Sequence, residues 1–489
     1  MAFVIADLLK DWPCTWLHGS FNEKVRGVKE DSRDVQTGDV FVVIKGRHAN
    51  GAIYIYEAIR NGAVCVISEN REDGGYAKEV AFGIVPNTRS FLSHASSRIH
   101  GNPSEHLHVV AVTGTNGKTT VSHMIGQLLT FLGYHTAVIG TLGLFVNGKK
   151  VIDDFPSLTT WSATHLHQTF AMLLKMNVTH VIIEASSMGL AQHRLDHCFI
   201  QQGVFLNIGH DHLEDHKGIE AYKKAKCRLL YLSEKIVVNE DDPFWFEIAK
   251  QSEKEVKWFG KKHLILEKLK PLSMDLKMKD EEREYSFEVG FNGVYNTSNI
   301  AAAIATVSQM DIPMSLILPL LPRLTLPAGR FQSIIQHPFQ VVIDYAHTPE
   351  ALKHLLSSAA QITTGKLLVV FGCGGDRDQS KRSEMGEIAA QYAQYLWVTS
   401  DNPRSEDPLK ICQQIIENLP YSNRIQIEID RAKAIEQALR FLKPGDFLCI
   451  AGKGHESTQH IGNQILPFSD EQTVRELLSS LSTSLNNEK

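Results

Sequence analysis

The sequence predicts an α/β protein of three domains, and three observations lead to this prediction. Short apolar, strand-like runs alternate with helical stretches, which is typical of largely parallel sheets; examples are Val109 to Val112, Val181 to Ile183 and Leu367 to Phe371. The chain has 489 residues, whereas single hydrophobic cores stop growing at roughly 250 to 300 residues. Turn-rich breaks lie at residues 100–104 and 321–338. We therefore expect domains near residues 1–105, 106–332 and 333–489.

The composition excludes several classes of function. Fifty Lys and Arg stand against 55 Asp and Glu, a formal charge of -5, so the chain has no general basic field for nucleic acid or an anionic membrane. The seven cysteines are odd in number and form no CxxC pair, which indicates a reduced compartment rather than a disulfide framework. The first residues lack a signal-peptide pattern, and no apolar run reaches the length of a membrane helix. We expect a cytoplasmic protein without membrane or nucleic-acid partners.

The second domain opens with a phosphate-binding loop. An apolar strand leads into TGTNGKTT at residues 113–120, and an amphipathic helix follows. Glycines let backbone amides turn toward phosphate at a helix N-terminus, Lys118 supplies a cation, and the Thr119 hydroxyl can bind Mg²⁺. The strict GxxxxGK[ST] pattern is incomplete because residue 112 is valine, but the strand-loop-helix context favours ATP binding over an incidental glycine turn. The expected ATP contacts are Gly114, Thr115, Asn116, Gly117, Lys118 and Thr119.

Motifs along the whole chain resemble those of the Mur ligase family, and within it the UDP-N-acetylmuramoyl-tripeptide synthetases. Besides TGTNGKTT, the motifs are EASS (184–187), QHR (192–194), DYAHTP (344–349), FGCGGDRD (371–378), DNPR (401–404) and AGKGHE (451–456). The resemblance implies an N-terminal uridine-nucleotide-binding α/β domain, a central P-loop ATPase domain with a mostly parallel sheet, and a C-terminal Rossmann-like α/β domain. It also implies a monomeric enzyme of peptidoglycan precursor synthesis.

The resemblance implies one reaction and a set of residues for it. ATP phosphorylates the D-glutamate carboxylate of UDP-N-acetylmuramoyl-L-alanyl-D-glutamate, and the amine of meso-2,6-diaminopimelate then displaces the phosphate. Such a site must mainly position and neutralise anionic groups. The implied catalytic residues are Lys118, Lys226, His212, Arg330, Asp344 and His347, and the implied Mg²⁺ ligands are Thr119, Glu184, His212 and Lys226. Asn296 and Asn299 approach the adenine, and the acceptor contacts are Ser32, Arg47, His48, Ala49, Thr159, Thr160, Ser186, Gln192 and Arg194.

Lys226 is the least expected of these residues. The spacing alone indicates an ordinary lysine on a helix surface. An ammonium beside two Mg²⁺ ions would also be strongly repelled. The resemblance removes this conflict because the family carboxylates this lysine to N-carboxylysine, an anion that helps to hold Mg²⁺.

The amine substrate is inferred from the third domain. The resemblance implies contacts to diaminopimelate from Arg377, Asp401, Asn402, Pro403, Arg404, Gly452 and Glu456, and lysine-using members usually lack the arginine of DNPR. Diaminopimelate differs from lysine by a second carboxylate, which a guanidinium can bind through two hydrogen bonds. Lysine would leave a desolvated arginine without a partner, at a cost of roughly 1 to 3 kcal/mol or more. The intact Arg404 therefore favours diaminopimelate.

Several alternatives remain open at this stage. Asn50 and Ala52 replace the Asp and His of a common Asp-Gly-His, Trp161 replaces a usual Pro, and Met188 replaces a frequent His. These acceptor-side departures fit a divergent second copy of the enzyme or a paralogue that accepts a modified nucleotide. A lysine-adding enzyme or another amide ligase, such as a folylpolyglutamate synthetase, is a further alternative, as is a non-catalytic scaffold. The histidines of residues 210–216 also resemble a zinc hydrolase motif, but one extra residue misplaces the ligands.

Overall fold

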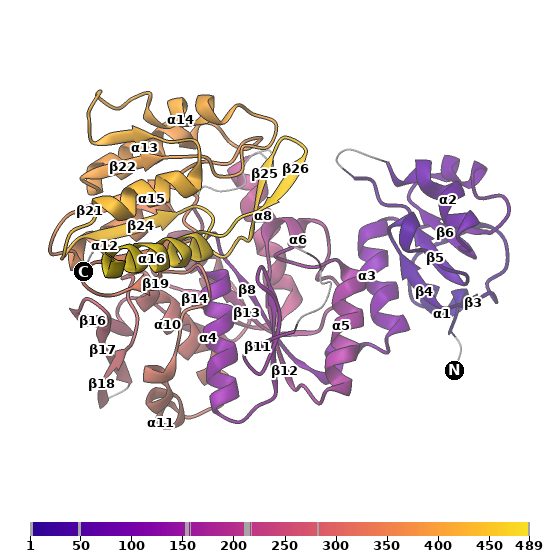
Figure 1. Cartoon of the computed structure of the whole chain (residues 1–489). Helices are drawn as coiled ribbons and strands as arrows, with labels where there is room; N and C mark the ends of the chain where they lie inside the picture. The colour runs from indigo at the N-terminus through magenta and orange to yellow at the C-terminus, as the bar shows by residue number, and fades with distance from the viewer. Residues whose placement is uncertain are drawn as a thin grey trace.

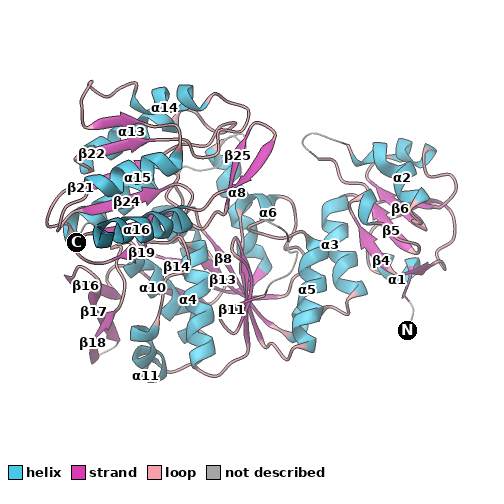
Figure 2. Ribbon diagram, viewed as in Figure 1, coloured by secondary structure: helices cyan, strands magenta, loops and turns pink. Residues whose placement is uncertain are grey.

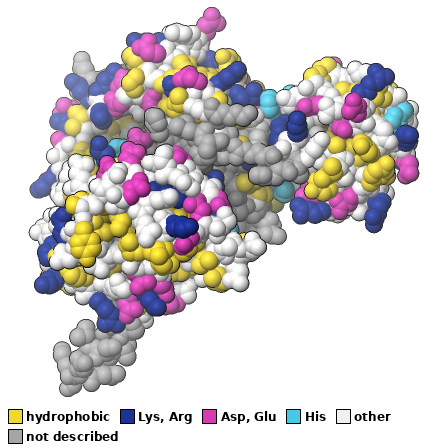
Figure 3. Space-filling view, turned by 90° about the horizontal axis from the view of Figure 1, so that it is seen from above, with side chains coloured by type: hydrophobic (Ala, Val, Ile, Leu, Met, Phe, Trp, Pro, Cys, Tyr) yellow, Lys and Arg dark blue, Asp and Glu magenta, His cyan; other side chains and the backbone are white. Residues whose placement is uncertain are grey.

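The computed structural model describes residues 3–46, 50–151, 156, 158–209, 216, 218–280 and 283–487 (Figures 1 and 2). It contains three α/β units in chain order, as the sequence predicted, and each is built on its own sheet. The N-terminal unit lies at one end of the molecule (Figure 1). Among the helices described, none is both long and apolar enough to cross a membrane. Basic and acidic side chains are interspersed on the face seen in Figure 3, which agrees with the balanced composition.

The N-terminal unit contains a five-stranded sheet that is buried on both faces. The strand order is β2 (Thr15–His18), β7 (Ala81–Ile84), β6 (Cys65–Ser68), β5 (Asp39–Val42) and β4 (Gly27–Lys29), and only β2 is antiparallel to its neighbour. Val40 and Val42 face one core, and Phe41 faces the other, because side chains alternate along a strand. A small sheet of β1 (Phe3–Val4) and β3 (Lys24–Val25) and the helices α1 (Ile5–Leu9), α2 (Ile55–Arg60) and α3 (Thr88–Ile99) complete the unit.

The middle unit contains an eight-stranded sheet. The strand order is β11 (Lys149–Lys150), β10 (Gly143–Val146), β9 (Thr136–Gly140), β12 (His180–Glu184), β8 (His108–Thr113), β13 (Ile200–Phe205), β14 (Ser233–Asn239) and β15 (Val256–Phe259). The strands from β9 to β15 are parallel, and β10 and β11 extend the sheet in antiparallel fashion. A separate antiparallel sheet follows, with β16 (Leu264–Leu269), β17 (Met274–Asp280) and β18 (Arg283–Val289).

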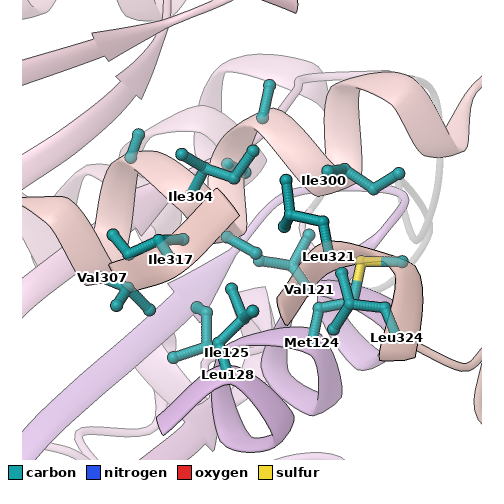
Figure 4. Packing of buried hydrophobic residues seen from close by; sticks show 14 of the residues in the cluster. Val121, Met124, Ile125, Leu128, Ile300, Ile304, Val307, Ile317, Leu321 and Leu324 are labelled. Atoms are coloured by element: carbon teal, nitrogen blue, oxygen red, sulfur yellow. The ribbon is translucent and has the colours of Figure 1, made fainter. Parts of the chain in front are cut away.

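Helices cover the middle sheet and join it to the N-terminal unit. They are α4 (Lys118–Phe131), α5 (Ala163–Lys175), α6 (Ser187–Ala191), α8 (Ile219–Leu232), α9 (Pro243–Lys250), α10 (Asn296–Ser308) and α11 (Met314–Ile317). On one face, Val121 and Ile125 of α4 and Ile300 and Ile304 of α10 belong to one apolar cluster (Figure 4). Helix α5 packs against α3 of the N-terminal unit. The phosphate-loop helix α4 is thus fixed by a continuous core.

The C-terminal unit contains a six-stranded sheet. The strand order is β19 (Gln332–Ile335), β20 (Gln340–Asp344), β24 (Phe447–Ala451), β21 (Leu367–Phe371), β22 (Tyr395–Val398) and β23 (Ile425–Ile427), and only β19 is antiparallel. Its helices are α12 (Pro349–Ile362), α13 (Lys381–Tyr392), α14 (Pro408–Ile416), α15 (Arg431–Phe441) and α16 (Asp470–Asn487). A hairpin of β25 (Thr458–Ile461) and β26 (Gln464–Pro467) lies outside this sheet.

The sheets bring the sequence motifs to their carboxyl edges. The phosphate loop follows β8, and Glu184 ends the neighbouring strand β12 in register with Val112. In the C-terminal sheet, FGCGGDRD, DNPR and AGKGHE extend from or follow the ends of β21, β22 and β24. Parallel sheets bind ligands outside the carboxyl ends of their strands. The fold therefore gathers motifs that are hundreds of residues apart in the sequence.

Candidate active site

A cavity of about 260 Å³ lies between the middle and C-terminal units. The predicted residues that line it are Thr115, Asn116, Gly117, Lys118, Thr119, Thr159, Glu184, Arg330, His347, Arg377, Asp401, Asn402, Arg404, Gly452 and Glu456. The lining also includes Thr120, Thr141, Tyr345, Gly372, Cys373, Gly374 and Lys381. A more open hollow of about 500 Å³ on the N-terminal unit, beside His18 and Lys78, contains none of the predicted residues. The motifs of the two units thus share one site.

The phosphate loop is shaped by glycine and by a neighbouring asparagine. Gly117 precedes α4 with a φ of 93°, and a β-carbon there would lie 2.6 Å from Oδ1 of Asn299. Asn207 holds the loop from the side, since its Oδ1 accepts the Asn116 amide at 2.8 Å and its Nδ2 donates to the Asn116 carbonyl at 3.0 Å. The Lys118 ammonium donates to the carbonyls of Gly114 and Thr115 at 2.9 and 3.0 Å. The loop is built to place amides and one cation at the start of α4.

Oxygen atoms converge at the end of β12. The Glu184 side chain, only 1% exposed, accepts the Thr119 hydroxyl at 3.0 Å and both the amide and the hydroxyl of Thr141 at 3.0 Å. Gly140 permits this approach, since a β-carbon at residue 140 would lie 2.0 Å from Oε1 of Glu184. Arg330 donates to the Thr119 hydroxyl at 3.2 Å. A carboxylate with hydroxyl neighbours is the donor set that Mg²⁺ prefers.

Lys226 is not the surface lysine that its spacing indicates. Its side chain is only 1% exposed, and its Nζ donates to the Gly114 carbonyl at 2.7 Å and to the Thr113 hydroxyl at 3.4 Å. The ammonium also lies 4.9 Å from the centre of the Tyr222 ring. Tertiary packing of α8 below the phosphate loop overrides the surface interpretation. His212, the other expected metal ligand, lies outside the described residues.

Asp344, a predicted catalytic residue, ends β20 and is buried, and it is not among the residues that line the cavity. Its carboxylate accepts the amides of Phe331 and Ala346 at 2.6 and 2.8 Å and the Tyr295 hydroxyl at 3.2 Å. Burial raises the pKa of Asp344 above its usual value, and the charge of Arg330 opposes that rise. These bonds hold together the segments that carry Arg330 and His347. The Arg330 guanidinium stacks 4.6 Å from the centre of the Tyr345 ring and reaches the cavity.

The C-terminal side of the cavity combines arginines with the buried carboxylate of Asp401 and the half-buried carboxylate of Glu456. Nη1 of Arg404 donates to the Gly375 carbonyl at 2.6 Å. Asn402 donates to Oε2 of Glu456 at 2.9 Å, and the fully buried Lys453 donates to the same Oε2 at 2.7 Å. Burial raises the pKa of Asp401, although the charge of Lys453 lowers it. The guanidinium groups of this arrangement can bind carboxylates of a substrate, and its carboxylates can bind ammonium groups of a substrate.

The chain matches known families over most of its length. The model of the Mur ligase middle domain matches residues 112–307, and that of the Mur ligase glutamate ligase domain matches residues 329–454. A UDP-N-acetylmuramoyl-L-alanyl-D-glutamate--2,6-diaminopimelate ligase of Aquifex aeolicus (strain VF5) is 36% identical over 466 residues, which cover 93% of this chain and 94% of that protein. The chain belongs to the Mur ligase family.

Two further proteins agree with this membership. A ligase with the same name from Agrobacterium fabrum is 37% identical and covers 94% of each chain. A solved structure of a ligase with that name has a TM-score of 0.69 at 29% identity, and the match covers 99% of this chain and 100% of the other. As a Mur ligase, the chain is an ATP-dependent ligase of an acid and an amino acid. Membership in this family argues against the zinc hydrolase, and the match over almost the whole chain to ligases with this name argues against the folylpolyglutamate synthetase.

The acceptor-side residues of this Mur ligase lie in two places. Near the cavity, the Thr160 hydroxyl donates to the Glu184 carbonyl at 2.7 Å, and Arg194 donates to the Thr160 carbonyl at 2.5 Å and to Gln192 at 2.6 Å. Ser186 accepts a hydrogen bond from Thr160 at 2.9 Å. Ser32 lies in the N-terminal unit and donates to Glu57 at 2.5 Å. Arg47, His48 and Ala49 lie outside the described residues.

The departures from the family pattern have different structural settings. Trp161 is fully buried in the core between α5 and the middle sheet. Asn50 accepts the Ala52 amide at 3.2 Å and so caps a short 3-10 helix at Gly51–Tyr54. Met188 is half-buried in α6. Trp161 therefore contributes to core packing, and Asn50 contributes to a turn.

Three groups that bear on this Mur ligase site were missed in the sequence. Thr141 and Lys453 contact the predicted residues directly, and Arg382 pairs with Glu406 at 2.8 Å while donating to the Gly374 carbonyl at 3.2 Å. Lys453 lies inside the AGKGHE motif, which was a usable signal. Thr141 follows the apolar run of β9 at the same sheet edge as Glu184, so strand-end polarity could have found it. Arg382 carries no local signal, because its role depends on tertiary burial.

Proposed function

We propose that this Mur ligase adds meso-2,6-diaminopimelate to the D-glutamate carboxylate of UDP-N-acetylmuramoyl-L-alanyl-D-glutamate in peptidoglycan precursor synthesis. The observation that carries this proposal is the single cavity lined by the phosphate loop, by Glu184 and by the DNPR and AGKGHE loops. The names of the relatives that match almost the whole chain support the same substrates. ATP is the co-substrate, and the γ-phosphoryl group passes to the acceptor carboxylate.

The chain supplies the phosphoryl-transfer step through positioning and charge. The loop amides and Lys118 hold the β- and γ-phosphates, and Arg330 neutralises charge as the phosphoryl group moves. The neutral amine then attacks the acyl carbon and the amide bond forms. Inorganic phosphate leaves with the electrons of the broken carbon–oxygen bond, and the proton lost by the nitrogen passes to phosphate or solvent. His347 lines the same cavity, and we assign it a catalytic role beside the bound nucleotide.

The oxygen cluster of Thr119 and Glu184 fits Mg²⁺, since its atoms are a buried carboxylate and a hydroxyl 3.0 Å apart. When bound there, Mg²⁺ would neutralise phosphate charge and the charge that develops at the transferred group. Thr119 and Glu184 hold the ion, with Thr141 fixing the carboxylate orientation. We assign His212 to a second position, by analogy with the family alone.

Lys226 belongs to this proposal as an N-carboxylysine. A buried ammonium next to a site for magnesium and phosphate would repel the metal ion, and its removal from water costs free energy. After the ammonium loses a proton, Nζ attacks carbon dioxide and releases a second proton, which leaves an anionic carbamate that can bind metal. The position of Nζ, 2.7 Å from the carbonyl at the start of the phosphate loop, supports this role.

The amine-binding end completes the proposal. Arg404 and Arg377 are assigned to the second carboxylate of diaminopimelate, and Glu456 and Asp401 to its ammonium groups. Asn402, Pro403 and Gly452 shape this end. We assign the uridine diphosphate to the N-terminal unit around Ser32 and the muramoyl-dipeptide to Thr159, Thr160, Ser186, Gln192 and Arg194, with adenine near Asn296 and Asn299. Domain boundaries near residues 105 and 332, a monomeric state and a cytoplasmic location stay predictions.

One experiment tests the substrate assignment. Phosphate release is measured with ATP, Mg²⁺ and the dipeptide nucleotide, first without an amine, then with meso-diaminopimelate or L-lysine added separately, and the product is weighed by mass spectrometry. We expect release with diaminopimelate and a product heavier by one diaminopimelate residue. Equal turnover of lysine would reject the assignment in favour of the lysine-adding enzyme, and absence of turnover of this nucleotide with either amine would reject it in favour of the divergent paralogue.

A further inference from the structure

The hairpin of β25 and β26 is bonded through its backbone to the DNPR loop. The Arg404 amide donates to the His460 carbonyl at 3.0 Å, and the Gly462 amide donates to the Arg404 carbonyl at 2.7 Å. Arg404 therefore forms a parallel bridge with Ile461, more than fifty residues further along the chain. The hairpin lies outside the six-stranded sheet, so these bonds are not part of the central fold.

Two more hydrogen bonds extend this contact along the same loop. The His460 amide donates to Oδ1 of Asn402 at 3.0 Å, and Nε2 of Gln459 donates to the Asp401 carbonyl at 2.8 Å. Asp401 is thus bonded to Gln459, Asn402 to His460, and Arg404 to both His460 and Gly462. One hairpin fixes the shape of the loop that carries the amine-binding residues.

The backbone of Arg404 needs such support. Its φ is 51°, in the left-handed region, which costs a residue with a β-carbon free energy unless the surroundings impose it. The hydrogen bonds on either side of Arg404 impose it here. The direction of the side chain follows from this backbone, because φ sets where the β-carbon points. Arg404 then reaches the Gly375 carbonyl at 2.6 Å and lines the cavity.

We propose that the hairpin of β25 and β26 is a specificity-determining element, which positions Arg404 for the second carboxylate of diaminopimelate. This role rests on the function proposed above. Arg404 contacts the substrate, whereas Gly462 acts through Arg404, and Gln459 through the Asp401 carbonyl of the same loop, as positioning residues. Releasing the hairpin would let Arg404 return to an ordinary backbone conformation and withdraw its guanidinium from the carboxylate. The enzyme would then bind diaminopimelate more weakly, while its affinities for ATP and for the acceptor would not change.

Two variants separate this role from general stability. Gly462→Pro removes the amide that donates to Arg404, and proline cannot adopt the φ of 56° at this position. Gln459→Met removes the donor to Asp401 while nearly keeping the side-chain volume. Gly462→Asn keeps the amide and tolerates the left-handed backbone, and no atom lies within 4 Å of a β-carbon at this position. Ile465→Thr, at a side chain that is 63% exposed on the other strand, is the matched control.

The measurement is steady-state phosphate release by the full chain, with the KM determined for diaminopimelate, ATP and the dipeptide nucleotide in turn. We expect Gly462→Pro and Gln459→Met to raise the KM for diaminopimelate about tenfold, while the other two KM values change by less than about twofold. Gly462→Asn should recover the KM for diaminopimelate to within about threefold, and Ile465→Thr should match the wild type. The rate with saturating L-lysine should not fall.

Three results would overturn the inference or the function beneath it. An equal rise of all three KM values, or a parallel loss with lysine, would make the hairpin a structural element only. An unchanged KM for diaminopimelate in both variants would show that the hairpin does not position Arg404; Gln459→Met decides this if the proline variant fails to fold. Absence of diaminopimelate turnover by the wild type would instead reject the proposed function.

Discussion

Gly140→Ala is expected to disable the oxygen cluster without unfolding the protein. A β-carbon at residue 140 would lie 2.0 Å from Oε1 of Glu184. Because ordinary van der Waals contact begins at 3.4 Å, the carboxylate must retreat by about 1.4 Å. Gly140 does not have a positive φ, so alanine adds no backbone strain there. The perturbation therefore acts on the position of one carboxylate.

The size of the effect follows from that displacement. A misplacement of about 1 Å in a catalytic group can cost roughly 100-fold in rate, which corresponds to about 2.7 kcal/mol of transition-state stabilisation. Mg²⁺ tolerates little distortion of its ligand distances. We expect kcat to fall by about 100-fold and the Mg²⁺ concentration for half-maximal rate to rise. The assay is phosphate release with saturating substrates over a Mg²⁺ titration, beside a thermal unfolding curve.

Two control variants distinguish displacement of the Glu184 carboxylate from a general loss of stability. Gly126→Ala would bring a β-carbon to 2.6 Å from the Val138 side chain, a clash in the core of the same sheet that does not involve Glu184. Gly290→Ala meets no atom within 4 Å and should leave both activity and stability unchanged. If Gly140→Ala keeps near wild-type activity, or loses activity only in proportion to a lowered Tm as Gly126→Ala does, Glu184 does not hold the metal.

Four further outcomes are expected. Lys226→Ala should lower kcat by about 100-fold or more, and short carboxylic acids should restore part of it; absence of rescue would argue against the carbamate. Arg404→Ala should lower kcat/KM for diaminopimelate about 30-fold or more, with little change in ATP affinity. This effect is equivalent to the loss of ~2 kcal/mol for truncating one partner of a charge pair. Equal losses of diaminopimelate turnover and ATP affinity would contradict the role of Arg404. Asp470→Asn breaks an ion pair with Arg431 in which both side chains are 0% exposed, so the free energy of unfolding should fall by about 3 to 5 kcal/mol in urea titrations. Burial, with the charges of His100 and His197, lowers the pKa of His167 from 6.5 to about 3. Between these two pH values the unfolded chain binds a proton at this histidine that the folded chain does not bind. The free energy of unfolding should therefore be full above about pH 6.5 and fall toward pH 3, by up to about 1.4 kcal/mol per pH unit, and His167→Gln should flatten that slope.

The sequence by itself determined the fold class and most of the cavity. Strands buried on both faces of parallel sheets are continuous apolar runs, so β8, β12, β21 and β24 were visible as such. Within each of the two sheets, motifs at the ends of those strands lie close together, because parallel strands present their carboxyl ends at one edge. The strand-loop-helix pattern predicted the phosphate loop, whereas the resemblance to the Mur ligase family implied the DNPR and AGKGHE loops, and the structure brings all three into one cavity.

Tertiary structure alone decided the burial and the partners of the remaining groups. Lys226 has the local pattern of a surface residue, but the packing of α8 places its Nζ under the phosphate loop. Thr141 becomes a partner of Glu184 only because β9 and β12 are neighbours. The left-handed Arg404 depends on hydrogen bonds from a hairpin more than fifty residues away. Local sequence cannot encode these features, since each depends on which distant segment supplies the contact.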